Sequence, residues 1–212
     1  GGIAPLRETV ASVLLQEMMW RRKTPLHDPF CGSGTIVIEA ALYAYNVAPG
    51  FGRRFALESL PIFNANRAAE IKRIEAEKIR PDVEVRITGS DIDPAAVERS
   101  RKNAEYACVT AGRALQSIGS DAKIIRPDFV QASFDELSAP YETGLLLCNP
   151  PYGERIGDEE EAEKLYNYLL ENSIEYNNLF VSISGREYHI KDYLKFEKKL
   201  YQILRVKAWK TH

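Results

Sequence analysis

The chain has 212 residues, of which 45% are hydrophobic and 27% are charged, and its formal net charge is −2. This balance predicts one globular domain with a sizeable core. It excludes overall positive charge as a basis for nucleic-acid binding, so RNA or DNA contacts must come from local patches or a partner domain. No apolar run has transmembrane length, the first residues lack a signal-peptide pattern, and no membrane association is expected. Three cysteines without CxxC spacing favour neither a disulfide framework nor a zinc site, and we expect a cytoplasmic protein without a metal.

The first part of the chain predicts the opening unit of a nucleotide-binding α/β fold. Apolar residues at helical spacing predict a helix over Leu6–Trp20, and Pro25–Asp28 has the composition of a short strand. A glycine turn follows, and Ile36–Tyr45 is nearly all apolar, as in a buried helix. The order of strand, glycine turn and buried helix is typical of nucleotide-binding folds.

The turn Asp28-Pro29-Phe30-Cys31-Gly32-Ser33-Gly34-Thr35 carries groups that could bind an amino-acid moiety. Gly32 and Gly34 let the backbone approach a ligand closely, and the first N–H groups of the next helix favour a carboxylate. Asp28, at the strand end, can accept from an ammonium group. S-adenosylmethionine (SAM) has both groups, so this turn is a candidate SAM site. Cys31 is expected to pack rather than to act as a nucleophile.

An insertion from Asn46 to Asn64 interrupts the alternation of strands and helices. It contains the glycine- and arginine-rich stretch Pro49-Gly50-Phe51-Gly52-Arg53-Arg54-Phe55. Two interpretations stay open: it borders the substrate cleft, with arginines for phosphates and phenylalanines for bases, or it is a surface excursion whose phenylalanines pack on the domain. Ala65–Arg80 then predicts an amphipathic helix. Its inward-facing residues are expected to be Ile71, Ile74 and Ile79.

The second strand is predicted over Glu84–Ser90. Asp91 follows it, at the position where such folds hydrogen-bond a ribose diol, and Ile92 could lie against the adenine. Asp93 has the character of a helix cap and begins a helix expected over Ala95–Ala111. Asp93 is therefore assigned a structural role.

A third strand is predicted over Lys123–Arg126, before Pro127-Asp128-Phe129. Asp128 could accept from the adenine amine of SAM with Phe129 beside the ring, and a turn or cap role for Asp128 stays open. Beyond the central strand described next, the sequence predicts a helix and further strands over Asp158–Tyr176, Leu179–Ser184 and Lys195–Lys210. The alternation of strands and helices predicts a doubly wound, mostly parallel sheet.

The most informative stretch is the apolar run Gly144–Cys148 and the loop Asn149-Pro150-Pro151-Tyr152-Gly153 that ends it. The run suits a strand buried on both faces, and two prolines without N–H groups then stop the ladder. A stiff loop at the carboxyl end of a central strand is where open α/β sheets bind ligands. The Asn149 side-chain oxygen and the Pro150 carbonyl are acceptors, and Tyr152 offers a flat face, which together suit the exocyclic amine of a nucleobase. The alternative is a proline-rich turn without a chemical role.

Asn-Pro-Pro-Tyr resembles the catalytic signature of amino-directed, SAM-dependent methyltransferases, and the Asp28–Thr35 turn resembles their SAM-binding motif. The resemblance spans nearly the whole chain and implies an α/β, Rossmann-like SAM-dependent methyltransferase fold with a doubly wound, mostly parallel seven-stranded sheet. Within these enzymes the chain resembles the bacterial 23S rRNA guanine-N2 methyltransferase group. Further matching segments are Ala4–Thr9, Pro49-Gly50, Asp91-Ile92-Asp93 and Lys199-Leu200-Tyr201. Gly52-Arg53-Arg54 and the stretch after Tyr201 depart from that group, which leaves the exact target open.

The resemblance implies a set of site residues and no metal. The implied catalytic residues are Asn149, Pro150 and Tyr152. The implied SAM-binding residues are Asp28, Phe30, Gly32, Gly34, Thr35, Asp91, Ile92, Asp128, Phe129 and Asn149.

The implied reaction is methyl transfer from SAM to guanine N2 of 23S rRNA. A guanine pocket also needs a donor for O6, which Arg53, Arg54 or Arg186 could supply. Relatives of this group usually carry an N-terminal RNA-binding THUMP domain, so residues 1–212 are expected to be the catalytic domain alone, and weak RNA binding is expected of it. Two alternatives stay open: a DNA or RNA adenine-N6 methyltransferase, and a non-catalytic nucleotide- or RNA-binding module.

Overall fold

The structure is a computed structural model that describes residues 6–18, 20–134, 144–149 and 178–181. These residues contain a five-stranded sheet with the order β3-β2-β1-β4-β5, in which every pair is parallel. The strands are β1 (Leu26–Asp28), β2 (Ile87–Asp91), β3 (Asp128–Gln131), β4 (Leu145–Cys148) and β5 (Asn178–Val181). This parallel arrangement confirms the Rossmann-like α/β class.

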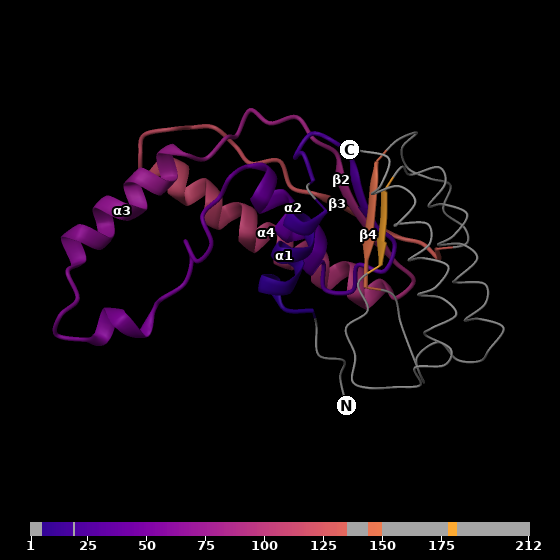
Figure 1. The fold of residues 1–212 in the computed structure, drawn as a ribbon, viewed down its shortest axis with the longest axis horizontal. Coiled ribbons are helices and arrows are strands. Elements are labelled where there is room, and N and C mark those ends of the chain that lie inside the picture. The colour runs from indigo at the N-terminus through magenta and orange to yellow at the C-terminus, as the bar shows by residue number, and fades with distance from the viewer. Residues whose placement is uncertain (1–5, 19, 135–143, 150–177, 182–212) are drawn as a thin grey trace.

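A helical layer packs beside the sheet (Figure 1). The helices are α1 (Glu8–Glu17), α2 (Thr35–Ala44), α3 (Ala65–Glu77) and α4 (Pro94–Gln116), and a 3-10 turn, η1 (Ala56–Ser59), precedes α3. Helix α2 contacts α1, α4, β1 and β2, while α4 also contacts β2 and β3. No helix in the described part of the chain is long and apolar enough to cross a membrane.

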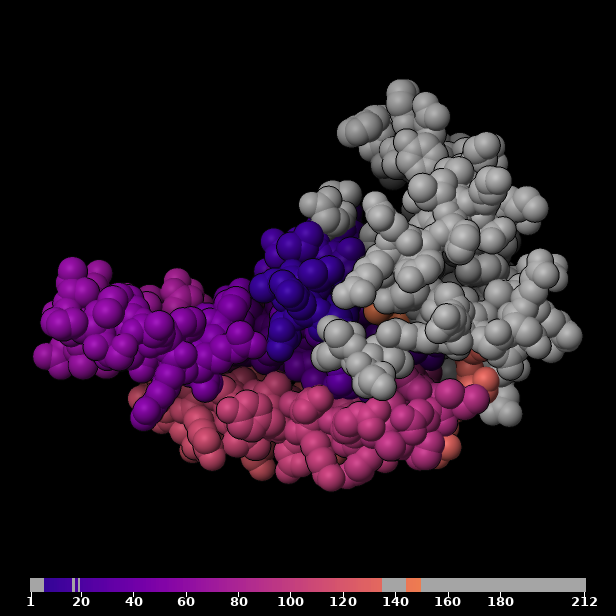
Figure 2. Space-filling view, turned by 90° about the horizontal axis from the view of Figure 1, so that it is seen from below, coloured from indigo at the N-terminus to yellow at the C-terminus, as the bar shows by residue number. Residues whose placement is uncertain are grey.

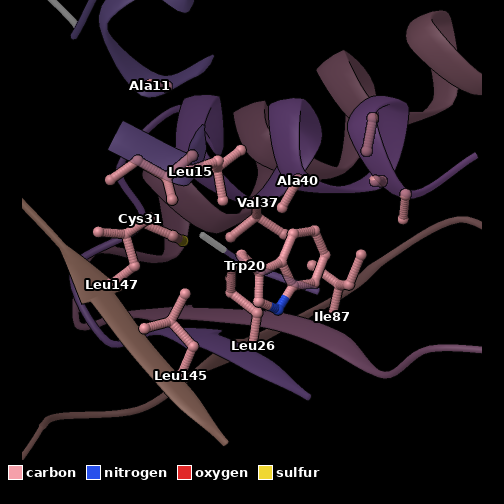
Figure 3. Close-up of a cluster of buried hydrophobic side chains, with 14 of the residues drawn as sticks. Ala11, Leu15, Trp20, Leu26, Cys31, Val37, Ala40, Ile87, Leu145 and Leu147 are labelled. Carbon is pink, nitrogen blue, oxygen red and sulfur yellow. The ribbon is translucent and has the colours of Figure 1, made fainter. Parts of the chain in front are cut away.

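The core lies between the helical layer and the central strands (Figure 3). Every residue of β1 and β4 is buried. Figure 3 shows Leu26 of β1 and Leu145 and Leu147 of β4 on one side of the cluster, with Leu15 and Val37 of the helices on the other. Central parallel strands are covered on both faces, which is why the central strand is apolar throughout.

Side-chain caps define the starts of two helices. The Asp93 carboxylate accepts from the N–H of Ala95 at 2.8 Å, and Pro94 occupies the first helical position of α4. Asn64 accepts from the N–H of Arg67 at 2.9 Å at the start of α3. These bonds satisfy N–H groups that have no partner inside the helix. The predicted cap at Asp93 is confirmed, although α4 continues to Gln116 instead of ending at Ala111.

The predicted position of the third strand is wrong. The strand is Asp128–Gln131, and these residues pair with Thr88–Asp91 of β2. Pro127 therefore precedes the strand instead of ending it, a place that proline tolerates because the first residue of a strand need not donate to the ladder. The expected helix over 158–176 and the strand region over 195–210 lie outside the described residues, as do residues 182–184 of the fifth strand.

The insertion begins against the helical layer and then extends away from it toward η1 and α3 (Figures 1 and 2). Phe51 is half-buried beside a small cluster that joins the end of α3 to α4 through Ala76, Ala114 and Leu115. Phe55, by contrast, is 53% exposed, so only part of the surface-excursion interpretation is confirmed. The prediction that Ile71 and Ile74 face inward is wrong, because α3 reaches α4 through Ala76 near its C-terminal end, and of the three isoleucines only Ile79 is buried.

Candidate cofactor and substrate site

The candidate site lies at the carboxyl ends of β1, β2 and β4. Leu26 of β1 pairs with Ile87 of β2 on one side and with Leu145 of β4 on the other. Strands β2 and β3 therefore lie on one side of β1, and β4 and β5 lie on the other. The direction of strand addition reverses at β1, and open α/β sheets bind ligands at such a switch point. Asp28 ends β1, Asp91 ends β2, and Asn149 directly follows β4.

The glycine turn after β1 is held in a left-handed conformation. Gly32 has φ +54° and Gly34 has φ +83°, a region that side chains rarely adopt. At Gly34 a Cβ would also meet Cβ of Ser100 at 2.9 Å and the Phe129 ring at 3.1 Å. Gly34 caps α2 without a side chain, so α2 begins at Thr35 with its N-terminus at the site. A helix N-terminus of this kind favours an anionic group.

Asp91 links this turn to the end of β2. Its Oδ2 accepts from the backbone N–H of Gly32 at 2.9 Å, and its Oδ1 accepts from the N–H of Asp93 at 3.0 Å. Each carboxylate oxygen keeps a second lone pair for a hydroxyl donor. The neighbouring Ile92 is 69% exposed, so its apolar surface is open at the same edge.

Asp28 is an acid in a buried place, with only 1% of its surface exposed. Its Oδ1 accepts from the N–H of Phe30 at 3.0 Å. Burial raises its pKa to about 8, the Phe30 N–H acts in the opposite direction, and the nearby charge of Asp91 raises it further. A cationic ligand group would offset the cost of ionising Asp28 in this buried place, because an opposite charge stabilises the ionised form.

The residues that follow β3 reach over the end of β2. The N–H of Ala132 donates to the Asp91 carbonyl at 3.1 Å, and the Phe134 ring lies 5.4 Å from the Phe30 ring between centroids. The sheet order puts β2 between β3 and β1, so this ring pair spans the strand end that carries Asp91. Sequence reasoning missed Ser133 and Phe134 as candidate site residues. A hydroxyl and an aromatic residue just after a strand are residue types that could have indicated ligand contact there.

Asp128 and Phe129 do not lie at that edge. Asp128 is the first residue of β3, opposite Thr88 and exposed, so the expectation that it lies at a carboxyl strand end is wrong. Phe129 is 5% exposed and contacts the positions of Gly34 and Gly89, which makes it a packing residue under the turn. The shift of β3 along the chain causes both differences.

Asn149 is the part of the Asn-Pro-Pro-Tyr loop that the structure describes, and it is half-buried. Pro150 and Tyr152 lie outside the described residues. Cys148, immediately before the loop, is fully buried, and burial together with the Asp28 charge raises its pKa. Strand β4 pairs with β1, so the loop begins beside the strand that ends at Asp28.

The buried side chains of His27, before the turn, and Cys31, within it, have structural roles. Both ring nitrogens of His27 have partners on β2, since Nδ1 lies 2.8 Å from Thr88 Oγ1 and Nε2 lies 3.3 Å from Ser90 Oγ. Burial lowers the pKa of His27 to about 4, so the ring is neutral at physiological pH. Burial and the two nearby aspartates raise the pKa of the Cys31 thiol, which agrees with its expected packing role. No cluster of potential metal ligands occurs among the described residues.

A family model described as UPF0020, RMKL-like, methyltransferase domain, matches residues 1–200. The chain belongs to this family. The RMKL-like domain is 38% identical over 170 residues to Ribosomal RNA large subunit methyltransferase K/L of Aliivibrio fischeri (strain MJ11), covering 78% of this chain and 22% of that protein. It is 37% identical over 168 residues to YpsC of Bacillus subtilis (strain 168), covering 79% of this chain and 40% of that protein. The RMKL-like domain thus spans less than half the length of these relatives.

Two solved structures agree with this assignment. A predicted N6-adenine-specific DNA methylase from Listeria monocytogenes str. 4b F2365 aligns with a TM-score of 0.71 and 33% identity, over 93% of the RMKL-like domain and 47% of that chain. SMU.472 complexed with SAH aligns with a TM-score of 0.65 and 29% identity, over 82% of this chain and 44% of that chain. Both support the Rossmann-like methyltransferase fold.

Proposed function

We propose that the RMKL-like domain binds SAM at the carboxyl edge of the sheet and transfers its methyl group to guanine N2 of large-subunit rRNA. The observation that carries the proposal is the arrangement of Asp28, Asp91 and the glycine turn around one switch point. It offers a buried acid for an ammonium, a helix N-terminus for a carboxylate and an acceptor for a ribose. The relative complexed with SAH supports the same ligand class.

The residues present fit each part of SAM. Asp28 would accept from the ammonium, while Gly32, Gly34 and the first turn of α2 from Thr35 would face the carboxylate. Asp91 would take the ribose hydroxyls. We place the adenine beside Ile92, Phe30 and Phe134, with Ser133 as a polar partner, in place of Asp128 and Phe129.

The proposed catalytic residues are Asn149, Pro150 and Tyr152. SAM would supply an electrophilic methyl group without a metal or covalent intermediate: the S–CH3 bond would break as the N–CH3 bond forms, S-adenosylhomocysteine would leave, and the methylated amine would release one proton to water. An exocyclic amine is a weak nucleophile because its lone pair is delocalised into the ring. The side-chain oxygen of Asn149 and the Pro150 carbonyl would accept from its two N–H bonds, and the positive charge that develops would meet two carbonyl dipoles. The base would leave its stack to reach this pocket, with Tyr152 as the platform.

The choice of rRNA follows the K/L relatives, whose name gives large-subunit ribosomal RNA. The choice of guanine N2 follows the resemblance of the sequence to the 23S rRNA guanine-N2 methyltransferase group. Arg53 is a poor donor for guanine O6, because it pairs with Glu8 of α1 at 3.3 Å. Of the candidates considered, Arg54 and Arg186 then remain the donors to test. The alternative is an adenine-N6 methyltransferase acting on DNA or RNA, and it is favoured by the similarity to the predicted N6-adenine-specific DNA methylase of Listeria monocytogenes.

Labelling with tritiated SAM tests the proposal on rRNA, tRNA and DNA, followed by digestion to nucleosides. We expect label in N2-methylguanosine from large-subunit rRNA, formed about a hundredfold to a thousandfold more slowly with Asn149→Ala. Label in N6-methyladenosine alone would establish the alternative. Calorimetric SAM binding without methyl transfer to any nucleic acid would indicate a non-catalytic binding module.

A further inference from the structure

Helix α4 carries an asparagine, Asn103, well inside its two ends. Asparagine is among the less favourable residues in a helix interior, because its amide competes for nearby backbone groups. The Nδ2 of Asn103 instead donates to the carbonyl of Ser33 at 3.0 Å, a residue 70 positions earlier in the chain. Because a carbonyl can only accept, the amide nitrogen must face it. A poor helix former that bonds a distant turn indicates a role outside its own helix.

This hydrogen bond acts on one peptide unit of the glycine turn. The Ser33 carbonyl and the Gly34 N–H belong to the same peptide, and that N–H donates to the Cys31 carbonyl at 2.7 Å. The peptide is therefore bonded at both ends. Gly34 has φ +83°, and a glycine adopts positive and negative φ about equally well. The two bonds thus select one orientation of a peptide that the glycine by itself leaves free to rotate.

Strand β2 and helix α4 hold different halves of the turn. Asp91, at the end of β2, accepts from the N–H of Gly32 at 2.9 Å and fixes the first half. Asn103 fixes the second half through Ser33. One helical turn earlier on α4, Ser100 lies so close to Gly34 that a Cβ there would meet its Cβ at 2.9 Å. The same face of α4 therefore both supports the turn and donates to it.

We propose that Asn103 is a positioning residue for SAM, an inference that rests on the proposed function. Its bond keeps the Ser33 carbonyl turned toward α4, which leaves the N–H groups at the start of α2 to the ligand carboxylate. Without this bond the carbonyl can rotate toward the carboxylate, and the two negative oxygens repel each other. Asn103 acts through the Ser33–Gly34 peptide and is assigned no contact with the reacting atoms.

Calorimetric titration with SAM tests the proposal on the 212-residue chain. Asn103→Ala should weaken binding roughly twofold to tenfold, the range for one neutral hydrogen bond. The urea midpoint should stay nearly unchanged, because the higher helix propensity of alanine offsets the lost bond. Asn103→Asp has the same shape without the donor and should lose at least as much affinity. Asn103→Gln keeps an amide donor and should recover most of it.

Glu105→Ala is the matched control, since Glu105 is an exposed residue of the same helix. It lies two positions after Asn103, about 200° around the helix and so away from the turn. This variant should bind SAM like the unmodified chain. A loss equal to that of Asn103→Ala would overturn the proposal, because the effect would then belong to α4 in general. So would unchanged affinity in both Asn103→Ala and Asn103→Asp, or an Asn103→Gln variant as weak as Asn103→Ala.

Amide hydrogen exchange measured by NMR on the free chain separates this inference from the proposed function. In Asn103→Ala the Gly34 N–H should exchange about twofold to tenfold faster, while the Gly32 N–H, which Asp91 holds, should keep its rate. Unchanged exchange at Gly34 would overturn the role of Asn103. An unmodified chain that bound no SAM would overturn the proposed function instead, and faster exchange at Gly34 would still show that Asn103 holds the turn. Circular dichroism checks folding, and the Asp and Gln variants give the same comparison if Asn103→Ala does not fold.

Discussion

The backbone N–H of Gly32 donates a 2.9 Å hydrogen bond to Oδ2 of Asp91, a residue 59 positions later in the chain. The other oxygen of the same carboxylate holds the N–H of Asp93 at 3.0 Å. One side chain thus joins the glycine turn after β1 to the turn after β2. The two turns are positioned relative to each other before any ligand arrives, which reduces the ordering that binding requires.

Asp91→Ala should weaken SAM binding roughly tenfold to a hundredfold, because a hydrogen bond to a charged group contributes about 1.5–3 kcal/mol. Titration calorimetry measures this. Asp93→Ala is the matched control, since it removes the α4 cap, worth about 1 kcal/mol of folding free energy, and should leave SAM affinity nearly unchanged. Equal losses of affinity in both variants would mean that destabilisation, not ribose binding, explains the effect.

Asp28 should make the stability of the free protein fall as pH rises. Its pKa is about 8 in the folded chain against 3.8 ordinarily. The unfolded chain therefore releases this proton at lower pH, so the contribution of Asp28 is complete below 3.8 and is lost as pH rises to about 8. Asp28→Asn should remove this slope in urea unfolding. The pKa of His27 is lowered, so it acts on the acid side, where stability falls as pH drops from 6.5 to about 4.

The same acid should couple SAM binding to proton release. A bound ammonium favours ionised Asp28, so below pH about 8 binding expels a proton and affinity rises with pH. Calorimetry in buffers of different ionisation enthalpy measures the released proton. Tight binding with no proton released at neutral pH would show that Asp28 is already ionised in the free protein.

Gly34→Ala should destabilise the fold more than Gly32→Ala. Both positions have positive φ, which costs an alanine about 1–2 kcal/mol. Only at Gly34 would the new Cβ also press on Ser100 and Phe129, while nothing lies within 4 Å at Gly32. The clash should add about 1–3 kcal/mol. Chemical unfolding of the two variants side by side measures the difference, and equal losses would argue against the close approach at Gly34.

Asn149→Ala should keep SAM affinity and lose most turnover. Asn149 follows β4, next to β1 and its terminal Asp28, and its proposed partner is the substrate amine more than the cofactor. Removing one preorganised acceptor of developing charge typically lowers turnover about a hundredfold to a thousandfold. Single-turnover methyl transfer at saturating SAM provides the measurement. A variant with near-normal turnover would remove Asn149 from the mechanism.

The parts of the site that depend on neighbouring residues could be predicted from the sequence. Two close glycines between a short strand and an apolar helix indicate the turn, and the cap at Asp93 needs only Pro94 and Ala95. The central strand is apolar throughout because central strands are covered on both faces. Local geometry and composition are sufficient in each case, so the pattern of residues predicts them.

The features that depend on distant partners could not be predicted, because they follow from how the folded chain brings separate elements together. Pairing with β2 sets where β3 begins. Asp128 and Phe129 therefore lie at the start of the strand, away from the site, and Phe134 lies against Phe30. Ile71 and Ile74 have the spacing of a buried face, but α3 meets α4 on its other side. Periodicity predicts which residues share a face of an element; which face is covered depends on what the rest of the chain places beside it.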